Sequence, residues 1–97
     1  MPELAMPLAK TRVQLDLSAV EVERMNWMMK VCGLESRKDL FNNALTLLEW
    51  ATEEVLAGRK IASFDEETRE RRILSMPVLK TAALHKGRYE PTDRLTA

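Results

Sequence analysis

The sequence predicts a mostly helical domain with one β-strand near its N-terminus, and two patterns support this. Residues 10–17, Lys-Thr-Arg-Val-Gln-Leu-Asp-Leu, alternate polar and apolar side chains, which is the two-residue period of a strand. From Ser18 to about residue 56, apolar residues recur instead with the spacing of two amphipathic helices. The fold class is therefore mostly α, with one strand, two core helices and a helical or irregular C-terminal extension.

The predicted strand has an apolar face, formed by Val13, Leu15 and Leu17. Its opposite face carries three polar side chains: Arg12, Gln14 and Asp16. No second strand-like run is evident in the sequence, and a lone strand cannot pair its backbone N–H and C=O groups within its own chain. We therefore expect the strand to pair with a second copy, so that a two-stranded ribbon forms with helices on one face and polar side chains on the other. Such a ribbon fits the major groove of DNA.

The first helix is expected to begin at Ser18 and to end at Gly33. Ser18 and Glu21 have the spacing of a capping box, in which each side chain bonds the backbone N–H of the other residue. The expected buried face comprises Val22, Met25, Met28, Met29 and Cys32. Cys32 is the only cysteine, which excludes an intramolecular disulfide, and we expect it to be a small buried side chain.

The second helix is expected to begin at Ser36, with Asp39 in its first turn, and to end at Gly58. Its apolar stripe runs over four turns: Leu40, Phe41, Ala44, Leu45, Leu48, Ala51, Val55 and Leu56. Further on, Asp65 and the two glutamates after it are expected to open a short helix that ends before Pro77. Pro77 is expected to open another helix that runs toward Gly87.

Four segments follow from these patterns. Residues 1–9 are expected to be a flexible arm, and residues 10–57 a domain for dimerisation and DNA binding. Residues 58–87 are expected to pack on that domain or on a partner, and residues 88–97 to be a flexible tail. A strand and two helices of about 50 residues bury too little surface to be stable alone, so we expect an obligate dimer. The alternative is a monomeric helical bundle with residues 10–17 as an extended lead-in.

The order of these features resembles the ribbon-helix-helix family of DNA-binding proteins. The resemblance covers residues 10–57 and is carried by Arg12-Val13-Gln14-Leu15-Asp16-Leu17-Ser18, Gly33-Leu34, Ser36-Arg37-Lys38-Asp39-Leu40-Phe41 and Ala44-Leu45. It implies two strands paired antiparallel in the major groove and a homodimer that can assemble into a dimer of dimers on double-stranded DNA. This chain departs from the family pattern at Asp16, at the additional residue Glu35 and at Lys38.

The resemblance also implies which residues contact DNA. By position, Arg12, Gln14 and Asp16 contact bases, because arginine suits guanine, glutamine suits adenine and a carboxylate accepts from cytosine N4. Four further residues are expected to contact phosphates, the last three at a helix N-terminus that attracts anions: Lys10, Ser36, Arg37 and Lys38. The alternatives are a solvated strand face, a merely exposed or salt-bridged Asp16, and ordinary surface charge at Arg37 and Lys38.

Two stripes remain that a minimal ribbon-helix-helix core does not need. Val20, Trp27 and Val31 form one on the first helix, and Leu47 and Trp50 form the other on the second helix. Because large apolar patches are rare on soluble proteins, we expect these side chains to be covered by the C-terminal segment folding back or by another protein.

Composition narrows the function further. Lysine plus arginine and aspartate plus glutamate both number 15, so the net charge is zero, which argues against a general polycation but not against local DNA contacts. One histidine, His85, and one cysteine make neither a metal cluster nor a nucleophile–base pair, so we expect no cofactor and no enzyme. We expect no membrane span and a cytoplasmic location, because no long apolar segment and no basic leader occur.

Three functions are thus compatible with the sequence. The first is a dimeric, sequence-specific DNA-binding protein that acts as a transcriptional repressor. The second is an antitoxin whose C-terminal segment binds a toxin protein. The third is a dimeric scaffold without DNA binding, which the zero net charge and Asp16 favour.

Overall fold

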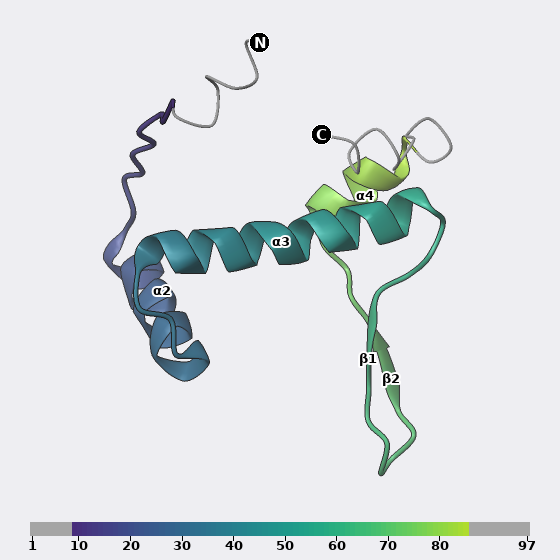
Figure 1. Cartoon of the computed structure of the whole chain (residues 1–97). Coiled ribbons are helices and arrows are strands. Elements are labelled where there is room, and N and C mark those ends of the chain that lie inside the picture. Colours follow the sequence, from purple (N-terminus) through teal and green to yellow (C-terminus); the bar gives the residue numbers. More distant parts are fainter. Residues whose placement is uncertain (1–8, 86–97) are drawn as a thin grey trace. The chain divides into compact units, whose positions relative to one another are not determined.

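The computed structural model describes residues 9–85, and Figure 1 shows their elements. In chain order these are α2 (Ala19–Cys32), α3 (Arg37–Leu56), β1 (Ala62–Phe64), β2 (Arg71–Ile73) and α4 (Pro77–Ala83). The mostly helical prediction is confirmed, with a small antiparallel sheet in addition. The chain divides into two compact units between Ser36 and Arg37, and each is described by itself. The predicted tail, residues 88–97, and all but the last residue of the predicted arm lie outside the described residues.

The predicted strand over residues 10–17 is wrong for the single chain. These residues carry no regular secondary structure and run as a zigzag trace into α2 (Figure 1). A strand needs a neighbour to bond its backbone groups, and no segment within residues 9–85 pairs with this one. Its apolar side chains are accordingly in solvent, with Val13 74% and Leu15 70% exposed.

The predicted ends of α2 are confirmed. The Ser18 Oγ accepts from the Glu21 N–H at 3.2 Å, and the Glu21 carboxylate accepts from the Ser18 N–H at 2.9 Å. At the other end, Gly33 adopts a left-handed conformation with φ of 68°. Its N–H donates to the Lys30 carbonyl and the Leu34 N–H donates to the Met29 carbonyl, which is the Schellman arrangement. The prediction that Cys32 is buried is wrong for the single chain, because this helix buries no residue fully.

α3 begins one residue after the predicted Ser36 and ends in the same way as α2. Gly58 has a φ of 86°, its N–H donates to the Val55 carbonyl, and the Arg59 N–H donates to the Glu54 carbonyl. The Arg59 guanidinium then reaches back to both carboxylate oxygens of Glu54, at 2.9 and 3.0 Å. This doubled contact lies just after the C-terminus of α3, where Gly58 has already turned the chain out of the helix.

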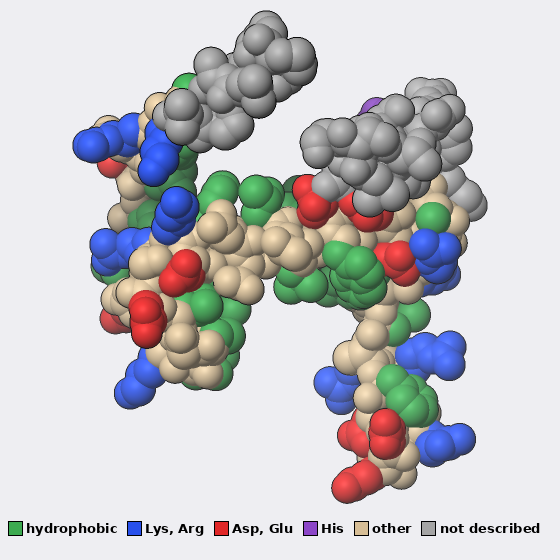
Figure 2. Space-filling model, viewed as in Figure 1, with side chains coloured by type: hydrophobic (Ala, Val, Ile, Leu, Met, Phe, Trp, Pro, Cys, Tyr) green, Lys and Arg blue, Asp and Glu red, His purple; other side chains and the backbone are tan. Residues whose placement is uncertain are grey.

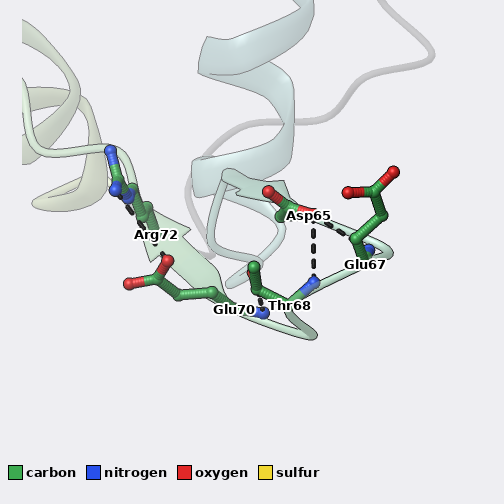
Figure 3. Close-up of polar contacts among 5 residues, drawn as sticks. All are labelled: Asp65, Glu67, Thr68, Glu70 and Arg72. Carbon is green, nitrogen blue, oxygen red and sulfur yellow. Dashed lines mark hydrogen bonds and ion pairs between the residues drawn. The ribbon is translucent and has the colours of Figure 1, made fainter.

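The helix predicted from Asp65 is wrong, because this segment is the loop of a β-hairpin. β1 pairs antiparallel with β2 in a register that sets Ser63 opposite Arg72. The Asp65 carboxylate accepts from the backbone N–H groups of Glu67 and Thr68, at 2.9 and 3.2 Å (Figure 3). Arg69 takes a left-handed φ of 62°, which turns the chain back toward β2.

The core of the second unit lies where α4 packs against α3. Ala51 of α3 and Leu79 of α4 are the two buried hydrophobic residues within residues 9–85. The helix predicted from Pro77 is present, with that proline in its first position, but it ends at Ala83, before the predicted stop at Gly87, which lies outside the described residues. Leu47 and Trp50 of α3 remain exposed, so α4 does not provide the cover predicted for them.

Candidate nucleic-acid interface

The predicted base-contacting residues all lie in solvent. Arg12, Gln14 and Asp16 are exposed on the segment before α2, as is Lys10 at its start. The neighbouring apolar residues are also exposed, so in the single chain the segment has no buried apolar face opposite its polar face. The polar side chains are therefore accessible to a nucleic acid. A two-stranded ribbon would require a second strand that pairs with this segment.

Three of the four predicted phosphate-contacting residues are consecutive in the chain at the start of α3, whereas Lys10 lies on the segment before α2. Arg37 and Lys38 are its first two residues, and Ser36 directly precedes them. The first turn of an α-helix has N–H groups without a partner in the helix, and its dipole favours anions. Two exposed cations at this end can therefore add charge to an anion-binding helix terminus. Asp39 in the same turn offsets part of that charge.

The sequence did not predict a second group of cations, which lies on the hairpin. Figure 2 shows basic and acidic side chains mixed along this hairpin. Arg69 lies over the Phe64 ring at 5.9 Å from its centroid, and Arg72 pairs with Glu70 at 3.8 Å (Figure 3). The hairpin that carries these cations could have been predicted from its loop residues Asp65 and Thr68, since aspartate and threonine frequently bond their own backbone in turns.

The described residues hold no group of three or more histidine, cysteine, aspartate or glutamate side chains placed to bind a metal ion. Among the helices of that same part of the chain, none is long and apolar enough to cross a membrane. Cys32 is the last residue of α2, and its free thiol is exposed.

No protein family, curated protein or solved structure matches this chain. The candidate DNA-contacting residues are thus defined by the chain itself, as two groups that are each described separately: an exposed alternating segment ahead of α2 and a basic start of α3.

Proposed function

We propose that the protein is a homodimeric, sequence-specific DNA-binding protein that acts as a transcriptional repressor. In this proposal residues 10–17 of two copies pair antiparallel, and the resulting ribbon enters the major groove. The observation that carries the proposal is the alternating segment itself, whose apolar residues Val13, Leu15 and Leu17 are all exposed in the single chain. A second copy supplies both the missing backbone partners and the cover for these side chains.

The apolar gain from such pairing is substantial. Burying an exposed valine or leucine side chain contributes about 1.5–3 kcal/mol. Val13, Leu15 and Leu17 are 74%, 70% and 39% exposed, so covering them in both chains gains about 5–11 kcal/mol before the cost of ordering the segment. That gross gain is large enough to make the fold depend on protein concentration.

The polar face of the ribbon then meets the bases. Arg12 suits the O6 and N7 of guanine, Gln14 suits the N6 and N7 of adenine, and Asp16 accepts from cytosine N4. Arg37 and Lys38 hold a backbone phosphate at the start of α3, with further contacts from Ser36 and Lys10. Bases give this arrangement its specificity, and phosphates give it register.

Binding to the DNA upstream of the protein's own gene tests the proposal. Fluorescence anisotropy with that duplex and a scrambled duplex, across about 50–200 mM salt, separates specific from general attraction. We expect Gln14→Ala to lose about 1–3 kcal/mol on the native duplex only. Lys38→Ala weakens binding to both duplexes and flattens the salt slope, whereas the control Lys30→Ala, in the last turn of α2, leaves both unchanged. Equal binding of wild type and both site variants refutes the docking.

The C-terminal half of the chain favours a second function, that of an antitoxin which binds a toxin protein. Several apolar side chains from β1 onward stay exposed although α4 packs on α3: Phe64, Ile73, Leu74, Met76, Val78 and Leu84. Binding to neither duplex at any salt concentration, together with a complex formed with the product of an adjacent gene, supports this function. Absence of both activities leaves a dimeric scaffold.

A further inference from the structure

A groove opens between the end of α3, the base of the hairpin on both sides of its two strands, and α4. It has a volume of about 390 Å³. Its apolar lining comes from all three parts: Val55, Ile61, Ile73, Leu74, Met76 and Leu79. Every one of these residues belongs to the second unit, so the groove does not depend on where the first unit lies.

Specific backbone bonds hold the groove walls. The Leu74 N–H donates to the Ile61 carbonyl at 2.7 Å, which closes the base of the hairpin. The Met76 carbonyl accepts from the N–H groups of Leu79 and Lys80, both at 3.0 Å, and thereby starts α4. The groove is therefore a built feature of the fold, since its walls are set by the hairpin and by the docking of α4.

The floor of this groove remains open to solvent. Leu79 is buried, but Ile73 is 54% and Leu74 46% exposed. A contiguous apolar patch that stays in water is typical of an interaction site on a soluble protein when it is large. The volume lies within the roughly 300–1,000 Å³ of ligand sites, but the exposed floor suits the side chains of a peptide better than an enclosed small molecule.

The charges at the groove decide what kind of peptide fits. Three cationic residues line it, and Arg59 is already bonded to Glu54. Lys60 and Lys80 are exposed, and within residues 9–85 neither forms an ion pair. An occupant that carries carboxylates beside aliphatic side chains satisfies both the floor and these two ammonium groups.

We propose that this groove binds an acidic amphipathic segment of a partner protein. Aliphatic side chains of the segment lie on Ile73 and Leu74, and its carboxylates face Lys60 and Lys80. The proposal does not rest on DNA binding, because it uses only residues 55–83. A protein that fails to bind DNA can still pass its test, so the two failures are distinguishable.

Selection from a random peptide library displayed on phage, with the full chain as bait, tests this proposal. We expect enriched peptides to combine aliphatic and acidic residues, and a synthetic copy to bind in fluorescence anisotropy. Leu74→Ser weakens that binding about tenfold or more, because the backbone bond of residue 74 remains while its apolar contact is lost. The double charge reversal Lys60→Glu with Lys80→Glu also weakens it, and it shifts the selection toward basic peptides.

A matched reversal, Lys30→Glu on α2, leaves the peptide affinity unchanged, and circular dichroism checks that each variant folds. Enriched peptides without acidic residues, or equal affinity for the wild type and Leu74→Ser, overturn the proposal. Failure to enrich any peptide overturns it as well. If sedimentation then shows that Leu74→Ser changes the oligomeric state, a second copy occupies the groove instead.

Discussion

Replacing Leu79 by alanine removes the side chain that holds α4 on α3. Leu79 is only 5% exposed, and loss of a buried leucine side chain costs about 2–5 kcal/mol. α4 has seven residues and no side-chain cap at its N-terminus, so it cannot persist without this contact. Because the other groove residues are partly exposed, the cavity can collapse, and we expect the lower part of that range, about 2–3 kcal/mol.

Two measurements check this expectation. Urea denaturation at one fixed protein concentration gives the loss in free energy of unfolding. Hydrogen exchange at the Lys80 amide, which bonds the Met76 carbonyl, reports whether α4 undocks. The matched control is Leu84→Ala, just after α4, where a 75% exposed side chain should change stability by less than about 0.5 kcal/mol. Equal effects of the two substitutions would refute the packing argument.

Three further perturbations act at the helix ends. Ser18→Ala should lower stability by about 1 kcal/mol in urea denaturation, through loss of the cap on α2. The pKa of its partner Glu21 is lowered, mainly by the hydrogen bond from the Ser18 N–H. The stabilisation that the Glu21 carboxylate contributes is therefore present above its ordinary pKa of 4.5 and is lost as pH falls through the folded pKa. Gly33→Ala should cost about 1–2 kcal/mol from its positive φ alone, because a Cβ there meets no atom within 4 Å. Arg59→Gln should return the lowered pKa of Glu54 toward 4.5 in an NMR titration, because the ion pair causes that shift.

The two long helices were predictable because their ends are determined by residues that are close together in the sequence. The Ser18–Glu21 box and the left-handed Gly33 define α2 through contacts that span at most five positions of the chain. Gly58 does the same for the end of α3. No partner and no distant contact is needed for such signals, so the sequence alone suffices to place them.

The hairpin was missed because its loop imitates a helix start. In a helix N-cap, an aspartate side chain accepts from the N–H groups two and three residues on. Asp65 makes this same pair of bonds, to Glu67 and Thr68, within a loop. The chain departs from a helix only at Arg69, whose positive φ is an uncommon state for a residue other than glycine. Strands of three residues on either side are too short to show an alternating pattern.

The candidate interface differs from these local elements, because in the proposed function its structure depends on a second copy of the chain. The polar residues of the segment were found from their two-residue period, but the strand they predict has no partner within residues 9–85. Its apolar and polar residues are both exposed, so in the proposed function the face that meets DNA is defined only once a second copy covers Val13 and Leu15. Under that proposal the alternating pattern belongs to a dimer, whereas the hairpin and the packing of α4 on α3 form within one chain.

This difference makes a prediction about concentration. If residues 10–17 form a strand only between two copies, their amides should gain protection from hydrogen exchange as the dimer forms, and in step with it. The Leu74 amide, bonded to the Ile61 carbonyl, should stay protected at every concentration, because its partner lies in the same chain. Hydrogen exchange and analytical ultracentrifugation over one dilution series give both quantities. Protection of residues 10–17 in the fully dissociated chain would mean that the segment finds a partner within its own chain, and the intermolecular ribbon would then be wrong.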